Sequence, residues 1–160
     1  MDIPETSPRL YVIDTCSLIA MTETYPLDVF PGVWSKVDEL IDTNILISVE
    51  DVLVELSSKD DEIHKWAKSR GDIFRELDGD VQSSAIEILN SHPNLLDIKN
   101  RKSSADPFLI AVARVSGGIV VTEEVYSGGP DRPKIPDVCK HYNIDCINLL
   151  KMLRNEQLKL

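Results

Sequence analysis

The sequence predicts an α/β fold with a central parallel sheet of four to five strands. Short apolar runs rich in β-branched residues recur along the chain, and segments with helical periodicity lie between them. Three of these runs are apolar at nearly every position, which is typical of parallel strands that helices bury on both faces. The alternation of the two patterns therefore indicates strands connected by helices.

The boundaries of the expected elements follow from these patterns. The expected strands span residues 10–13, 44–48, 118–122 and 145–148, with a weaker candidate at residues 95–98. The expected helices span residues 17–22, 31–42, 49–57, 60–69, 80–91, 104–115, 137–143 and 149–156. Ser48 is expected to cap the helix that begins at Val49, with Asp51 three residues later as its capping partner. Several helices in succession make the middle of the chain more helical than a simple alternation of strands and helices would be.

The composition indicates a single domain over residues 1–160. A length of 160 residues fits one domain, and a hydrophobic content of 42% excludes wholesale disorder. No apolar run approaches the ~20 residues of a membrane span, and the first residues resemble no secretory signal. The 3 cysteines lie far apart and form no disulfide framework. We therefore expect a cytoplasmic protein that has no contact with a membrane.

The chain is strongly acidic, and this limits the kinds of partner it can have. With 17 Lys and Arg against 27 Asp and Glu, the formal net charge is −10. A protein that coats nucleic acid usually needs a basic face to neutralise phosphates, so that class is disfavoured. An enzyme acting on nucleic acid is still compatible with this charge. Its carboxylates contribute negative charge, and a bound divalent cation reverses the local field.

Acidic residues follow the expected strands at the positions where a parallel sheet binds its ligands. Asp14 follows the first strand, and Glu123 and Glu124 follow the strand at 118–122. Glu55 lies in the helix after the second strand, and Asp106 lies in the first turn of the helix at 104–115. Carboxylates gathered at one sheet edge repel one another unless a cation neutralises them, and oxygen ligands suit Mg²⁺ or Mn²⁺. Each acid taken alone also fits a helix cap or a solvated surface residue.

Four segments that contain these acids resemble motifs of the PIN domain family. The segments are YVIDTCSLIA with Asp14, SVEDVLVELSS with Glu55, SADPFLIAVA with Asp106 and IVVTEE with Glu124. Their order and spacing match along nearly the whole chain. The segments TYPLDVFPGVW and KIPDVC are similar to those of a subfamily of uncharacterised PIN-like toxins. Glu124 stands where the family usually has Asp, so Glu123 is an open alternative, and Cys16 stands where many members have Asn or Ser.

The resemblance implies a single PIN-like domain with a three-layer α/β/α sandwich and the activity of a metal-dependent ribonuclease. It implies that Asp14 and Asp106 bind Mg²⁺ or Mn²⁺ directly and that Glu55 and Glu124 complete the site. It also implies the toxin of a type II toxin–antitoxin pair, with an RNA substrate, a cognate antitoxin protein and a homodimer as partners. Whether one or two metal ions take part stays open.

Other polar residues have two interpretations each. The hydroxyls of Thr15, Ser17 and Thr122 either orient carboxylates and water or cap the strand ends. Five cations near the acids either hold substrate phosphates or are solvated loop charges: Lys99, Arg101, Lys102, Arg132 and Lys134. The 3 histidines have no ligand spacing, so they are expected at the surface or at helix ends.

Two rival functions remain to be weighed. A haloacid-dehalogenase-like phosphohydrolase also begins with a strand that ends in Asp, but its chemistry needs a second Asp two residues later, where this chain has Cys16. A PIN-like fold that binds a partner without cleaving RNA is compatible with Glu124 and with the acidic composition. Because all four carboxylates are present, we favour the nuclease.

Overall fold

Five parallel strands form one sheet in the computed structural model, which describes residues 9–58, 61–96, 105–128 and 131–158. The strands are β1 (Tyr11–Ile13), β2 (Leu46–Val49), β3 (Phe74–Arg75), β4 (Ile119–Val121) and β5 (Cys146–Ile147). Their order across the sheet is β3-β2-β1-β4-β5, and every pair is parallel. Tyr11 of the central strand lies opposite Leu46 on one side and Ile119 on the other. The predicted parallel sheet is confirmed.

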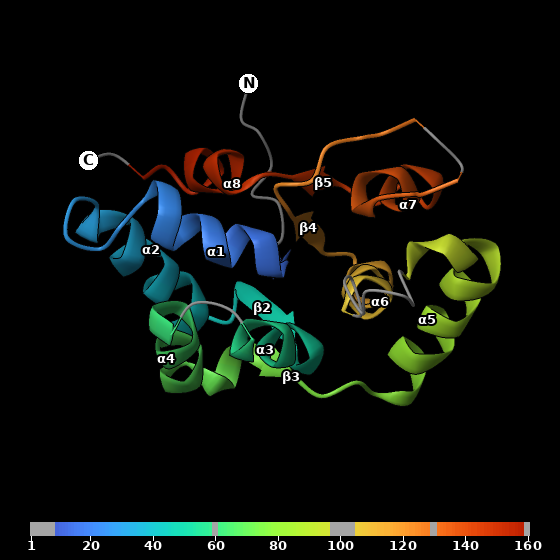
Figure 1. Cartoon of the computed structure of the whole chain (residues 1–160), viewed down its shortest axis with the longest axis horizontal. Coiled ribbons are helices and arrows are strands. Elements are labelled where there is room, and N and C mark those ends of the chain that lie inside the picture. The colour runs from blue at the N-terminus through green and yellow to red at the C-terminus, as the bar shows by residue number, and fades with distance from the viewer. Residues whose placement is uncertain (1–8, 59–60, 97–104, 129–130, 159–160) are drawn as a thin grey trace, which may run out of the picture.

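Helices cover both faces of this sheet. They are α1 (Thr15–Thr24), α2 (Pro31–Asp42), α3 (Glu50–Ser57), α4 (Asp61–Ser69), α5 (Gly79–Ser91), α6 (Asp106–Ser116), α7 (Ile135–His141) and α8 (Leu149–Asn155). In Figure 1, α1 and α2 lie on one side of the strands, and α5, α6 and α7 lie on the other. This arrangement is consistent with the three-layer α/β/α sandwich that the sequence led us to expect. None of the described helices is long and apolar enough to cross a membrane.

The core explains why the strand runs are continuously apolar. The side chains of Tyr11, Val12 and Ile13 in β1 are fully buried, because neighbouring strands pair with both edges and helices cover both faces. From α6, Leu109 and Ile110 are also fully buried. A strand in this position has no solvated face, so the alternation of apolar and polar residues is absent.

A side-chain cap defines the start of α5, and a left-handed glycine defines the end of α6. Asp78 begins α5, since its Oδ1 accepts a hydrogen bond from the amide of Val81 at 2.9 Å. Gly117 ends α6 in the left-handed conformation (φ +73°) that favours glycine, and its amide donates to the carbonyl of Ala113. The chain then turns directly into β4.

Two expectations from the sequence were wrong. At residues 95–96 the structure shows no strand where the weak candidate at 95–98 was expected, because Leu95 ends a 3₁₀ turn (Pro93–Leu95). Residues 97–98 of that candidate lie outside the described chain. The fifth strand is instead β3, whose two residues are too few to show any periodicity. Ser48 does not cap α3, because its hydroxyl donates to the carbonyl oxygen of Ile13 in the neighbouring strand at 2.7 Å. Val49 takes the cap position without a side-chain hydrogen bond.

Candidate active site at the carboxyl edge of the sheet

The strand order creates a topological switch point between β1 and β4. From β1 the chain adds β2 and β3 on one side, and it returns later to place β4 and β5 on the other side. Ligands of open parallel sheets bind outside the carboxyl ends of the strands at such a point. Asp14 directly follows β1 and Thr122 directly follows β4, so both residues lie at this edge.

Asp14 is buried and held by three donors. It caps α1, with 4% of its surface exposed, and its Oδ1 accepts the amide of Thr15 at 2.7 Å. Its Oδ2 accepts the Cys16 thiol and the Thr122 hydroxyl, each at 2.9 Å. Burial raises the pKa of Asp14 to about 6, and the negative charge of Glu124 adds to this, although the hydrogen bonds from Cys16, Thr122 and Thr15 act in the opposite direction.

Glu55 connects three segments that are far apart in the sequence. From α3, its Oε2 accepts the hydroxyl of Thr15, which lies 40 residues earlier. Its Oε1 accepts the amide of Ala105 at 3.0 Å, 50 residues later. Asp106 follows Ala105 as the first residue of α6 and is 5% exposed. Thr15 and Glu55 therefore join the start of α1, which Asp14 caps, to the start of α6.

The two adjacent glutamates after β4 have different partners. Glu123 accepts hydrogen bonds on Oε1 from the Ser17 hydroxyl at 3.1 Å and from the amide of Leu149 at 3.0 Å, which ties it to α1 and α8. Glu124 accepts the amide of Ile135 at 2.9 Å, at the start of α7. Glu124 is also the acid whose charge raises the pKa of Asp14. This proximity favours Glu124 over Glu123 as the fourth acid of the edge.

The hydroxyls singled out from the sequence all contact acids. Thr15 donates to Glu55, Thr122 donates to Asp14, and Ser17 donates to Glu123. Cys16 lies among them, with its sulfur 3.2 Å from the Thr122 hydroxyl oxygen and accepting the amide of Glu123. Burial and the charge of Asp14 raise the pKa of the Cys16 thiol, so it stays protonated and donates to Asp14 rather than acting as a nucleophile.

The oxygens at this edge suit a hard divalent cation in their chemistry, but their arrangement is not a preformed cage. Carboxylates are the ligands that Mg²⁺ prefers, and Asp14 is a buried acid whose ionised form a cation would favour. Within the described residues, no group of three or more His, Cys, Asp or Glu side chains could hold a metal ion. The carboxylates of Asp14, Glu55 and Glu124 accept hydrogen bonds from the chain instead. Binding a cation here requires these acids to exchange some of those bonds.

Comparison with known protein families shows the family to which the chain belongs. A family model described as a domain of unknown function, DUF4411, matches residues 11–160. The chain belongs to the DUF4411 family. A search of curated proteins gave no match for this DUF4411 protein.

The cations expected near the acids are only partly described. Arg132 and Lys134 are exposed in the segment between Glu124 and α7 of the DUF4411 chain. Lys134 directly precedes α7, and its amide donates to Asp137 at 2.7 Å. Lys99, Arg101 and Lys102 lie outside the described residues.

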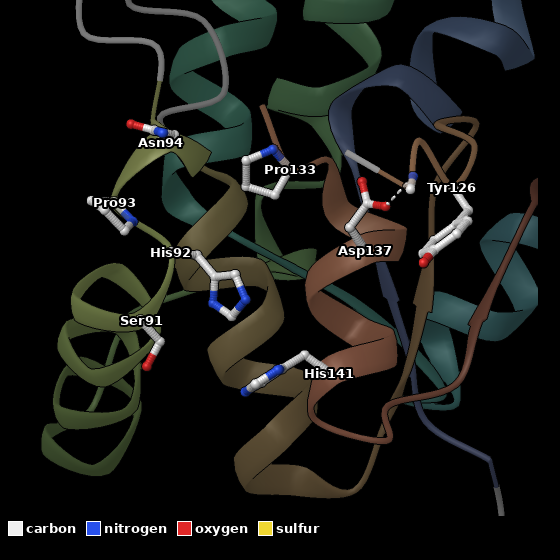
Figure 2. A pocket seen from close by; sticks show the side chains of 9 residues that line it. Ser91, His92, Pro93, Asn94, Tyr126, Pro133, Asp137 and His141 are labelled. Carbon is white, nitrogen blue, oxygen red and sulfur yellow. Dashed lines mark hydrogen bonds between the residues drawn. The ribbon is translucent and has the colours of Figure 1, made fainter. Parts of the chain in front are cut away.

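One feature of the DUF4411 structure had no signal in the sequence. A pocket of about 390 Å³ lies between the end of α5 and α7, and its wall includes His92, Asn94, Tyr126, Asp137 and His141 (Figure 2). These residues come from three segments and show no motif spacing. The sequence led us to expect the histidines at the surface or at helix ends. His92 does follow the last residue of α5, and His141 ends α7.

Proposed function

We propose that this DUF4411 protein is a divalent-metal-dependent ribonuclease of the PIN type, which hydrolyses RNA phosphodiester bonds. The observation that carries the proposal is the hydrogen-bonded network at the switch point of the sheet. Thr15 donates to both Asp14 and Glu55. Thr122, two residues before Glu124, donates to Asp14, and Ala105, one residue before Asp106, donates to Glu55. Two of these acids, Asp14 and Asp106, are buried, and burial raises the pKa of Asp14. Acids with a perturbed pKa at the ligand-binding edge of a sheet are candidates for a functional site.

Each residue would have a distinct role in such a site. Asp14 and Asp106, both buried, would hold the cation, while Glu55 and Glu124 would complete its surroundings. A bound divalent cation supplies positive charge that stabilises the phosphate oxygens and makes a nearby water more acidic. Thr122 fixes the orientation of Asp14, and Thr15 fixes that of Glu55. Glu55 also holds the backbone at Ala105, which sets the position of the following Asp106.

Cleavage of RNA by purified protein tests this proposal directly. With Mg²⁺ or Mn²⁺, we expect Asp14→Asn and Asp106→Asn each to lower the cleavage rate by about 10²- to 10³-fold. Asp42→Asn is the matched control, because Asp42 lies at the end of α2 and pairs with Arg70 instead. Equal cleavage by the wild type and by both edge variants would contradict the assignment. If the wild type cleaves no RNA, the alternative of a PIN-like module that only binds gains support.

The adjacent glutamates provide a sharper test within the same site. Glu124→Gln removes the charge that acts on Asp14, so we expect cleavage to fall by about 10²-fold. Glu123→Gln changes a side chain bonded to Ser17 and Leu149, and we expect less than a tenfold loss. The two rates are measured on one RNA at one metal concentration. The reverse order of the two effects would assign the fourth acid to Glu123.

A toxin of a toxin–antitoxin pair is the biological role that we propose for this activity. The support is the resemblance of its motifs to PIN-like toxins, and the role implies an antitoxin protein and a homodimer as partners. Induced expression should arrest growth, and the Asp106→Asn chain should not. Co-expression of the product of a small neighbouring gene should restore growth. Unimpaired growth under induction without that neighbour would contradict the role while leaving the nuclease assay valid.

A further inference from the structure

The pocket between α5 and α7 has the volume of a small-ligand site. Its volume is about 390 Å³, within the range of roughly 300–1,000 Å³ of such sites. Figure 2 shows that it lies between the end of α5 with the following 3₁₀ turn on one side and α7 on the other. Helix α7, which lines the pocket, begins at Ile135, and the amide of Ile135 donates to Glu124 of the proposed nuclease site.

Two histidine rings form one wall of the pocket. The rings of His92 and His141 meet edge to face with their centroids 4.9 Å apart, although one follows α5 and the other ends α7. Burial lowers the pKa of His92, and the neighbouring His141 adds to this. A neutral imidazole offers one donor, one acceptor and an aromatic face. Asn94 also lines the pocket and contributes an amide that can both donate and accept, although Figure 2 shows it farther along the wall than the two rings.

The carboxylate in the pocket wall is already satisfied by the chain. Asp137 Oδ1 accepts the amides of Ser127 at 3.1 Å and Gly128 at 3.0 Å. Its Oδ2 accepts the Ser127 hydroxyl at 2.8 Å and the amide of Lys134 at 2.7 Å. Four donors lower the pKa of Asp137, although its partial burial opposes them, and they occupy both of its oxygens. Asp137 therefore holds the wall in place and is a poor ligand for a cation. Because the same wall carries the two imidazole rings, an aromatic ligand with polar edges fits the pocket better.

The pocket is connected to Glu124 of the acidic edge by the chain itself and by one hydrogen bond. Tyr126 and Gly128 of its wall follow Glu124 by two and four residues. The Glu124 carboxylate accepts the amide of Ile135, the first residue of the helix that carries Asp137 and His141. The exposed side chain of Lys134 lies between the two regions along the chain, where it could meet a phosphate.

We infer that this pocket binds one nucleoside of a single-stranded RNA, with its base against the His92–His141 ring pair while the adjoining phosphodiester lies at the acidic edge. The inference rests on the proposed function, because it assigns the substrate of that site. Bases stack on aromatic side chains in single-stranded RNA recognition, and polar groups beside the rings meet the base edges. A free nucleotide has the same chemistry, so the test must separate the two sources.

Binding measured in EDTA separates this inference from catalysis. The chain has 3 histidines, so the imidazole signals of His64, His92 and His141 can be followed individually by NMR. His64 on α4 is an internal reference, because α4 and α7 lie at opposite ends of the view in Figure 1. Titration with a single-stranded RNA hexamer of mixed sequence should shift the signals of His92 and His141 and leave that of His64 in place. The four nucleoside monophosphates should bind at least tenfold more weakly than the hexamer.

Variants at the exposed His141 keep the test independent of folding. His141→Ala should weaken hexamer binding by about tenfold, His141→Phe should restore part of the loss because it retains a ring, and His64→Ala should change nothing. Unchanged His92 and His141 signals, or an unchanged affinity of His141→Ala, would overturn the inference even if the protein cleaves RNA. A monophosphate that binds as tightly as the hexamer would also overturn it. Shifts at both histidines in a protein that never cleaves RNA would support the pocket and remove the nuclease.

Discussion

At the scale of single residues, Asp14 illustrates how position and burial together raise the pKa of a carboxyl group. It stands after β1 because an acid there can cap α1, and its Oδ1 does accept the amide of Thr15. Central placement of β1 then buries it, so an ordinary helix cap becomes an acid whose pKa is raised to about 6. Cys16 and Thr122 limit this rise by donating to Oδ2. The same carboxylate therefore serves the fold as a cap and serves the proposed site as a ligand.

The raised pKa of Asp14 predicts a specific dependence of stability on pH in EDTA. The folded chain holds a proton on Asp14 up to about pH 6, whereas the ordinary value is 3.8, so stability is lost as pH rises through this window. Asp14→Asn keeps the shape without the charge. We expect this variant to be more stable than the wild type at pH 7.5, by on the order of 2 kcal/mol, and equally stable below pH 4.

Urea denaturation at the two pH values measures this difference. Asp42→Asn is the control, because Asp42 is solvent-facing and paired with Arg70, and it should show no gain at pH 7.5. A wild type that is more stable than Asp14→Asn at pH 7.5 in EDTA would show that the buried carboxylate is not destabilising when ionised.

At the scale of elements, the ends of α6 determine how the acids and the sheet are connected. Its first residue, Asp106, follows the amide that Glu55 holds from α3. Its last turn ends at Gly117 in the left-handed conformation, and Gly118 then begins the approach to β4. A Cβ at Gly118 would lie 3.2 Å from the carbonyl oxygen of Leu10, whereas a Cβ at Gly117 would meet no atom within 4 Å. The two glycines therefore serve different physical needs.

Alanine at each of these glycines should give different losses of stability. At Gly117 the cost is the left-handed backbone alone, about 1 kcal/mol, and Asn should cost less than Ala. At Gly118 the added methyl group presses on the backbone of Leu10, just before β1, so we expect a larger loss, about 2 kcal/mol or more. Urea denaturation of the three variants measures these values. If Gly118→Ala is as stable as Gly117→Ala, the backbone of Leu10 is able to yield.

At the scale of the whole molecule, the sheet order brings the acids to one edge. Strand β1 lies between β2 and β4, which come from distant parts of the chain, and all strands point the same way. Their carboxyl ends therefore meet, and helices α1 and α6 begin there from opposite faces of the sheet. The acids have their own hydrogen-bond partners in this arrangement, so a cation that binds must be favourable enough to replace them.

Binding of a cation should stabilise the whole fold by mass action. At a Mg²⁺ concentration about 100 times its Kd, the gain is roughly 2.7 kcal/mol, which for a domain of this size raises Tm by about 5–10 °C. Thermal denaturation at pH 7.5 with Mg²⁺ or EDTA measures this shift. We expect it to disappear in Asp106→Asn and to persist in Asp42→Asn. An equal shift in Asp106→Asn would place the cation elsewhere on the protein.

The sequence by itself determined the fold class, most helix positions and the alignment of the acids with the strand ends. These follow from local periodicity, because a buried parallel strand is apolar throughout and a surface helix repeats every 3.6 residues. The helix expected over residues 31–42 matches α2 at both ends, since Pro31 marks its start. The short edge strand β3 gave no signal, because pairing with β2 rather than its own composition makes it a strand.

The tertiary structure decided which side chains meet. Ser48 bonds to Ile13 across the sheet rather than capping its own helix, and Glu55 bridges Thr15 and Ala105. In the tertiary structure Glu123 accepts a hydrogen bond at the start of α8, whereas Glu124 accepts one at the start of α7. The rings of His92, which follows α5, and His141, which ends α7, are in contact. Contacts of this kind depend on strand order and helix placement, which are set by packing between remote segments. No local pattern of residues carries that information.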